Sequence, residues 1–354
     1  MENLENINIL SFKEIPAPLE IKKELPITDD VANFVISSRE TVKNILLRKD
    51  PRILIIVGPC SIHDEKAAID YAKRLKAVAS EISNNIFIIM RVYFEKPRTT
   101  IGWKGFINDP FLNGSFCMEE GLRRARRLMI EINKLGLPVA SEALDPFVPQ
   151  YLDDLITWTA IGARTVESQT HREMASGLST PVGFKNSTDG SFQPALNALK
   201  AVSGGHHFLG INEEGKICVC HTRGNTFAHI VLRGGSRPNY DSVSIDMCEA
   251  ELEASGLAKN IMIDCSHDNS FKKAELQIPV LRHCLTQILE GNQSIFGFML
   301  ESNLHTGSQK LETNQTLQYG VSITDECIGW DETEKILLEA NEKLSETLLE
   351  LRAS

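Results

Sequence analysis

Short apolar segments rich in Ile and Val alternate with longer amphipathic segments from residue 53 to the end of the chain. Such apolar runs are typical of strands buried on both faces, and the amphipathic segments are typical of helices that cover a parallel sheet. We predict eight strands, at residues 53–57, 86–92, 138–142, 159–164, 181–185, 229–233, 261–267 and 296–301. The count of eight favours an α/β fold of the (β/α)8 TIM-barrel class over an open sheet.

Two segments fall outside this alternation. Residues 1–50 contain Pro16, Pro18 and Pro26, so we predict an N-terminal extension with a helix near residues 29–47 and a regulatory or oligomer-contact role. Residues 207–211 and 216–222 flank a polar turn and predict a β-hairpin insert between strands 5 and 6. Residues 51–354 then form the barrel domain, with helices expected at 65–79, 118–135 and 332–351.

Composition excludes several classes of protein. The formal net charge of -10 argues against a nucleic-acid partner, because such proteins normally carry a basic excess. No apolar run reaches the length of about eighteen residues that a membrane span needs, and residues 1–10 are too acidic and amidic for a secretory signal. The 8 cysteines include no C-x-x-C pair, which favours reduced thiols. We therefore expect a cytoplasmic protein.

Ionisable or metal-binding side chains stand at the carboxyl ends of the predicted strands, where barrel enzymes place their active sites. Strand by strand, these residues are Cys60, Arg91, Glu142, Arg164, Lys185, Arg233, His267 and Glu301. Burying so many polar groups would cost several kcal/mol each unless they are paired or serve a ligand. This pattern predicts a catalytic barrel.

Five cations of this region would form a ring suited to a small, multiply anionic substrate, since Arg clamps phosphate or carboxylate with two hydrogen bonds. They are Arg91, Lys96, Arg164, Lys185 and Arg233. A phosphorylated carboxylate fits this charge best.

A second set of residues predicts a metal site: Cys60, His267, Glu301 and Asp325. This mixed sulfur, nitrogen and oxygen shell suits one divalent ion, Mn, Fe, Co or Zn, better than Mg. Such an ion would be a Lewis acid. A lone cysteine is more often a buried hydrophobe, but Cys60 and His267 fall on separate strand tips, which favours the metal site.

Two other features are assigned structural roles. Cys218 and Cys220 resemble a metal clip, but strand alternation places both on one face without a C-x-x-C knuckle, which favours packing. The basic run at residues 123–127 is predicted to lie on a solvated helix face.

Three long motifs, at residues 91–100, 161–185 and 319–325, resemble those of type I 3-deoxy-D-arabino-heptulosonate 7-phosphate (DAHP) synthases, and the similarity runs from about residue 36 to the C-terminal helix. The resemblance implies that phosphoenolpyruvate, erythrose 4-phosphate and water react to give DAHP and phosphate. This reaction is the first step of the shikimate pathway of aromatic amino acid biosynthesis.

The resemblance also implies roles for single residues. Arg164 and Arg233 would hold the phosphate of phosphoenolpyruvate, and Arg91 and Lys185 its carboxylate. Arg98 and Thr99 would take the phosphate of erythrose 4-phosphate. Glu142 and Ala163 complete the predicted substrate site. The predicted catalytic residues are Lys96, which would lie between the substrates, Cys60 and His267.

The chain departs from the family pattern at two positions where Gly is usual. Asp268, next to His267, would add negative charge near the metal and alter its affinity, and Ser187 would strain a turn. Neither is a predicted ligand.

Two alternatives remain open beside this assignment. A related synthase uses arabinose 5-phosphate, but its best-known members carry Asn in place of the Cys and lack the Lys-Pro-Arg-Thr-Thr stretch found at residues 96–100. A catalytically inactive barrel acting as an amino-acid sensor would be favoured by loss of a metal ligand, and all four predicted ligands are present.

Members of this family are inhibited by tyrosine, phenylalanine or tryptophan. By resemblance, the effector pocket would be lined by Gln150, Ser179, Phe208 and Gly210, and closed by the N-terminal extension of a neighbouring subunit in a homodimer or homotetramer. Phenylalanine-sensitive members place Ser where this chain has Gly210, and Gly would leave room for the hydroxyl of tyrosine. We therefore predict inhibition by tyrosine above phenylalanine. The alternative is that Gly210 only eases the hairpin.

Overall fold

A computed structural model describes residues 4–98, 102–312 and 316–353. Its centre is a closed barrel of parallel strands in the order β1-β10-β9-β8-β5-β4-β3-β2. The strands are β1 (Ile53–Gly58), β2 (Ile86–Arg91), β3 (Val139–Glu142), β4 (Trp158–Ile161), β5 (Val182–Lys185), β8 (Ala228–Leu232), β9 (Ile261–Asp264) and β10 (Ile295–Glu301). Each overlaps one predicted strand, so the predicted TIM barrel is confirmed.

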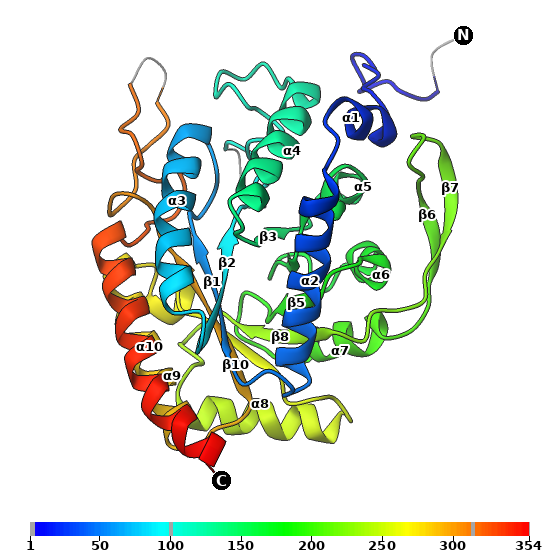
Figure 1. Cartoon of the computed structure of the whole chain (residues 1–354). Helices are drawn as coiled ribbons and strands as arrows, with labels where there is room; N and C mark the ends of the chain where they lie inside the picture. Colours follow the sequence, from blue (N-terminus) through cyan, green and yellow to red (C-terminus); the bar gives the residue numbers. More distant parts are fainter. Residues whose placement is uncertain (1–3, 99–101, 313–315, 354) are drawn as a thin grey trace.

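Helices surround the barrel (Figure 1). They are α3 (Glu65–Glu81), α4 (Met118–Lys134), α5 (Val148–Leu152), α6 (Gln169–Gly177), α7 (Gln193–Val202), α8 (Ser242–Ala254), α9 (Gln277–Leu289) and α10 (Trp330–Ala353). Side-chain caps fix where some begin, since they satisfy amide groups that the first helical turn leaves unpaired. Asp64 accepts hydrogen bonds from the amides of Lys66 and Ala67 at the start of α3.

The N-terminal extension contains α1 (Pro18–Glu24) and α2 (Asp29–Leu46), and the second matches the predicted helix. The last turns of α2 bury Val42, Ile45 and Leu46 in one cluster with residues of the barrel strands such as Leu54 and Trp158. The end of α2 thus packs as part of the barrel core, and the extension is not an independent layer.

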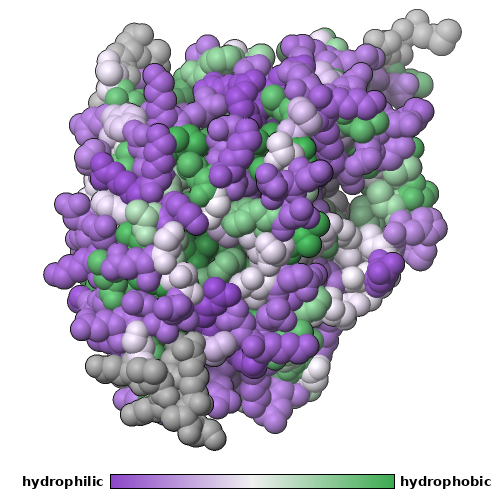
Figure 2. All heavy atoms as spheres, viewed as in Figure 1, coloured by the Kyte–Doolittle hydropathy of each residue, from purple (hydrophilic) through white to green (hydrophobic). Residues whose placement is uncertain are grey.

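The predicted hairpin insert is confirmed as a separate antiparallel pair, β6 (His207–Ile211) and β7 (Ile217–His221). It extends away from the barrel beside α6 and α7 (Figure 1). Leu209, Ile217 and Val219 are exposed on one face of it. Figure 2 shows hydrophobic residues at this edge of a largely hydrophilic surface.

The prediction of a solvated basic face on α4 is wrong for Arg126. This side chain is buried and donates two hydrogen bonds of 2.8 Å to the Asp154 carboxylate. It also donates to the carbonyls of Leu25 and Tyr151, so it joins α4 to the N-terminal extension. In the described part of the chain, no helix has the length and apolarity that crossing a membrane requires.

Candidate active site and metal centre

A polar pocket opens at the carboxyl ends of the barrel strands. Among its lining residues are Arg91, Lys96, Arg98, Glu142, Ala163, Arg164, Lys185, Arg233, His267, Glu301 and Asp325. The structure therefore brings together the predicted substrate and catalytic residues, with two exceptions. Cys60 is fully buried beside the pocket, and Thr99 lies outside the described residues.

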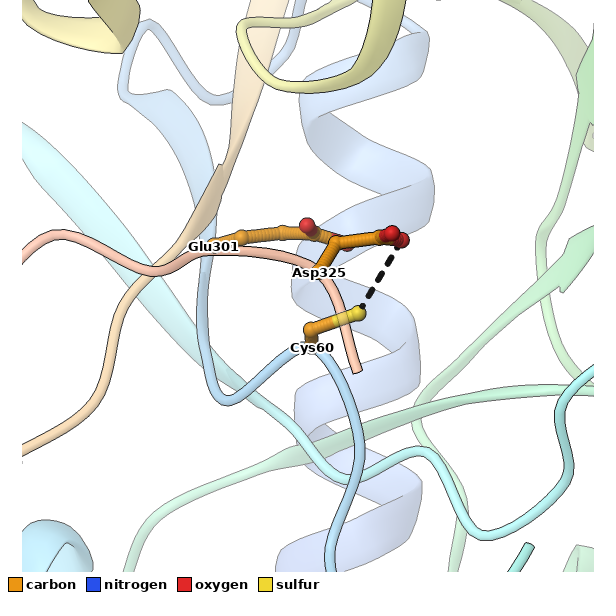
Figure 3. Close-up of side chains that lie close together, drawn as sticks. All are labelled: Cys60, Glu301 and Asp325. Carbon is orange, nitrogen blue, oxygen red and sulfur yellow. Dashed lines mark hydrogen bonds between the residues drawn. The ribbon is translucent and has the colours of Figure 1, made fainter. Parts of the chain in front are cut away.

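Three of the four predicted metal ligands converge. Cys60, Glu301 and Asp325 each offer a ligand atom, and these atoms lie within 4.8 Å of one another (Figure 3). Cys60 Sγ donates to Asp325 Oδ2 at 3.4 Å. Cys60 lies just beyond β1, Glu301 ends β10, and Asp325 comes from the loop before α10. Thiolate and carboxylate together form the donor set of a borderline divalent cation, so these residues fit such a metal.

His267, the fourth predicted ligand, lies at the edge of this cluster. Its Nε2 is 3.8 Å from Glu301 Oε1, and its Nδ1 is 2.9 Å from Asp264 Oδ2. The predicted strand over 261–267 ends early at Asp264, and His267 begins a short 3₁₀ helix with a left-handed φ of 55°. This bend turns the imidazole so that one ring nitrogen faces Glu301 and the other faces a buried carboxylate.

Lys96 contacts the cysteine directly, with Nζ 3.1 Å from Cys60 Sγ. Burial and the charge of Glu301 raise the pKa of Cys60 to about 12, although Lys96 opposes this shift. Burial alone would raise the pKa of Asp325, but Lys96 and His267 outweigh it and lower that pKa to about 2. The cluster thus holds a carboxylate and a protonated thiol beside a cation.

Two predicted substrate cations form buried ion pairs. Arg91 donates to Glu301 Oε1 at 2.8 Å, and both side chains are 1% exposed. Lys185 Nζ lies 2.7 Å from Asp264 Oδ2. Since a buried charge is costly unless paired, these carboxylates hold both cations in place at the pocket wall.

Arg233 pairs with Asp268, one of the two residues at which the chain departs from the family pattern. The carboxylate also pairs with Lys272, and its effect on metal affinity stays a prediction. The expected strain at Ser187 is absent. The φ of Ser187 is not in the left-handed region, and its hydroxyl donates to Asp189 Oδ1.

Arg98 and Arg164 are exposed at the rim of the pocket. Arg98 Nε donates to the Trp103 carbonyl at 2.8 Å. The rim therefore carries positive charge in addition to that of the buried cations.

Two glutamates, Glu95 and Glu142, line a smaller cavity, and Glu142 also lines the polar pocket. Glu95 is 3% exposed, and burial, followed by the charge of Asp145, raises its pKa to about 8. Oε1 of Glu142 is buried without a hydrogen-bond partner in the described structure. Such an orphaned acceptor is available for a hydrogen bond from a ligand.

A second pocket lies between the hairpin and helices α5 and α6. The four predicted effector residues, Gln150, Ser179, Phe208 and Gly210, all line it. The reason given for tyrosine needs correction, however. A Cβ built on Gly210 would lie 2.7 Å from Cys220 Sγ, so sulfur occupies the space that the glycine leaves.

Sequence reasoning missed residues that position the site. Asp264 pairs with both Lys185 and His267. It lies in the strand predicted at residues 261–267, and this place in the predicted strand is the sequence signal that could have identified it. Gln277 exchanges two hydrogen bonds with the backbone of Glu301, at 2.8 and 3.0 Å. Lys272 and Lys273 line the pocket and follow the predicted strand end as an adjacent basic pair.

Comparisons with known proteins agree with this geometry. The model of the DAHP synthetase I family matches residues 26–338. The tyrosine-sensitive phospho-2-dehydro-3-deoxyheptonate aldolase of Escherichia coli is 49% identical over 343 residues, which cover 97% of this chain and 96% of that protein. The solved structure of the aldolase of the same name from Francisella tularensis has a TM-score of 0.93 at 46% identity, and covers 96% of this chain and 99% of that one.

Relatives with other effector specificities are almost as similar. The phenylalanine-sensitive aldolase of Escherichia coli is 47% identical and covers 94% of this chain. The tryptophan-sensitive aldolase of Buchnera aphidicola is 46% identical and covers 95%. The chain is thus similar, to nearly the same degree, to relatives with three different effector specificities.

Proposed function

Since the chain belongs to the DAHP synthetase I family, we propose that it condenses phosphoenolpyruvate with erythrose 4-phosphate and water to give DAHP and phosphate. The observation that carries this proposal is the pocket itself, where cations line the same cavity as a cluster fitted to a divalent metal. Two anionic substrates repel each other, and this positive lining offsets that repulsion.

The cations divide between the two substrates. Arg91 and Lys185, buried and held by carboxylates, would bind the phosphoenolpyruvate carboxylate, while Arg164 and Arg233 would bind its phosphate. Arg98, at the rim, and Thr99 would hold the phosphate of erythrose 4-phosphate. This arrangement would bring C3 of phosphoenolpyruvate close to the aldehyde carbon. Glu142 and Ala163 also line the pocket and would complete its walls.

Cys60, His267, Glu301 and Asp325 would hold one Mn, Fe, Co or Zn ion, which when bound supplies a Lewis acid for the aldehyde. The contact between His267 Nδ1 and Asp264 supports this role. Metal-binding histidines usually donate their second ring N–H to a carboxylate, which fixes the ring and the tautomer. Nε2, the nitrogen facing Glu301, is then free to bind the ion.

Lys96 is the proposed proton donor. Burial alone would lower the pKa of Lys96, but the charges of Cys60 and Glu301 raise it by more, so the net shift is upward. Lys96 therefore carries a proton at neutral pH. In the reaction C3 attacks the aldehyde carbon, water adds at C2, and the C–O bond to phosphate breaks. The new alkoxide takes a proton from Lys96, and the proton that water releases on adding at C2 restores Lys96.

We also propose that the second pocket binds an aromatic amino acid, with tyrosine favoured over phenylalanine, in a cytoplasmic homodimer or homotetramer. The supporting observations are the gathering of Gln150, Ser179, Phe208 and Gly210 and the exposed apolar side chains on the hairpin. Residues 1–50 would contribute to this contact between subunits, since Leu10 and Phe12 are also exposed.

The catalytic proposal is tested by measuring phosphate release from phosphoenolpyruvate with erythrose 4-phosphate and, separately, with arabinose 5-phosphate.

A further inference from the structure

Cys218 and Cys220 lie side by side on the pocket face of β7. Their Sγ atoms are 3.9 Å apart, both side chains are half-buried, and both line the second pocket. Sequence reasoning favoured packing for this pair. The hydrophobic core does not include them, and both residues line a cavity of mixed polar and apolar character.

The distance between the sulfur atoms suits a shared cation. Two zinc–sulfur bonds of about 2.3 Å at a tetrahedral angle separate the sulfur atoms by about 3.8 Å. A disulfide fits less well. Residues two apart on an extended strand have Cα atoms about 6.7 Å apart, at the upper limit that a disulfide spans. The pair is therefore arranged as a dithiol.

We propose that Cys218 and Cys220 form a second metal site, which binds a thiophilic divalent cation of the Zn²⁺ and Cd²⁺ class within the hairpin pocket. Each thiol gives up its proton to the solvent, and the two thiolates share one ion, so that no oxidant or reductant is needed. Within the described residues, the active-site cluster is the one place where three or more potential ligand atoms lie close together, so the protein supplies two ligands at the cysteine pair. Water or a ligand in the pocket would fill the remaining coordination positions of the ion.

The surroundings of the pair agree with this role. Gly210 stands opposite Cys218 in the hairpin register, and its missing side chain leaves the space that Cys220 Sγ occupies. Burial, and then the hydrogen bond and charge of Cys218, raise the pKa of Cys220. Cation binding displaces the thiol protons, so binding weakens as the pH falls.

Cadmium titration of the Mn²⁺-saturated enzyme tests this site. Bound Cd²⁺ is counted by equilibrium dialysis, and the thiolate-to-cadmium absorption band is measured in parallel. The wild type is expected to bind one more Cd²⁺ per chain than the Cys218→Ser/Cys220→Ser double variant. Each single variant should bind at least about tenfold more weakly, because one thiolate is lost. Cys117→Ser, which removes a half-buried thiol at the start of α4, should keep the extra ion.

The double variant distinguishes Cd²⁺ bound at the hairpin pair from Cd²⁺ bound at the active site, because Cys60 is present in every protein compared. Equal Cd²⁺ content and equal absorption in the wild type and the double variant would overturn the proposal. Loss of the extra ion in Cys117→Ser would also overturn it. Failure of the proposed catalytic function would leave the cadmium count unchanged.

Discussion

The ammonium group of Lys96 lies 3.1 Å from the sulfur of Cys60, and both side chains are buried. One contact therefore links the proposed metal ligand to the proposed proton donor. The same amine donates to the Cys60 carbonyl at 3.3 Å, which fixes its position. A change at Cys60 should thus alter the metal and the placement of Lys96 together.

Cys60→Ala should lose bound metal and turnover while the barrel stays folded, because it removes the one sulfur of the ligand cluster. Metal analysis, initial rates and circular dichroism measure these effects. Cys248→Ala removes a buried thiol in α8 and should change stability alone. Full activity of a metal-stripped Cys60→Ala enzyme would contradict the assigned site.

Arg164→Ala and Arg233→Ala should each raise the KM for phosphoenolpyruvate by about tenfold to a hundredfold, since each removes a charge-assisted hydrogen-bond donor. Arg98→Ala should raise the KM for erythrose 4-phosphate instead. Separate titrations of the two substrates measure both effects. The same change in all three variants would show that the proposed division of the cations is wrong.

Asp268→Ala should lower the KM for phosphoenolpyruvate by roughly threefold to tenfold, because the carboxylate now competes with the substrate phosphate for Arg233. Asp268→Asn should act in the same direction, since it removes the charge and keeps the shape. A higher KM in both variants would mean that Asp268 orients Arg233 for the substrate and does not compete with it.

Glu95→Gln should change how stability depends on pH. The folded-state pKa of Glu95 is raised from 4.5 to about 8, so folded chains hold a proton that unfolded chains release between these values. Wild-type stability then falls as the pH rises through this window. The unfolding free energy of Glu95→Gln minus that of the wild type should therefore increase by about 3 kcal/mol between pH 5 and pH 7.5. Denaturant titrations of both proteins at the two pH values measure this difference.

Glu131→Gln is the matched control for this measurement, because Glu131 is an exposed residue of α4. Its unfolding free energy relative to wild type should be nearly the same at both pH values. A Glu95→Gln difference that is also independent of pH would show that Glu95 is ionised in the folded protein.

Initial rates should show stronger inhibition of the wild type by tyrosine than by phenylalanine. Gly210→Ser should move this preference towards phenylalanine, with a coupling change of about 1 to 3 kcal/mol. The new Cβ would meet Cys220 Sγ, so the shift should be clearest in Gly210→Ser combined with Cys220→Ala. Stronger inhibition of the wild type by phenylalanine refutes the specificity, and no inhibition by any aromatic amino acid refutes the pocket's role.

The barrel was predictable because its strands are apolar runs of regular spacing, and the ionisable residues followed from where those runs end. Contacts made by loops were not predictable from the sequence. His267 lies beyond β9 in a left-handed turn, and only this turn brings Asp268 to Arg233. The burial of Arg126 was also hidden, because helical periodicity does not show that the N-terminal extension covers α4.

Phosphate release from phosphoenolpyruvate is the most direct measurement of the proposed catalytic function. Erythrose 4-phosphate and arabinose 5-phosphate should be compared as acceptors, each with and without a chelator. The account predicts rapid, chelator-sensitive release with erythrose 4-phosphate and little with arabinose 5-phosphate. Release that is faster with arabinose 5-phosphate, absent with both sugars, or unaffected by removal of the metal would contradict it.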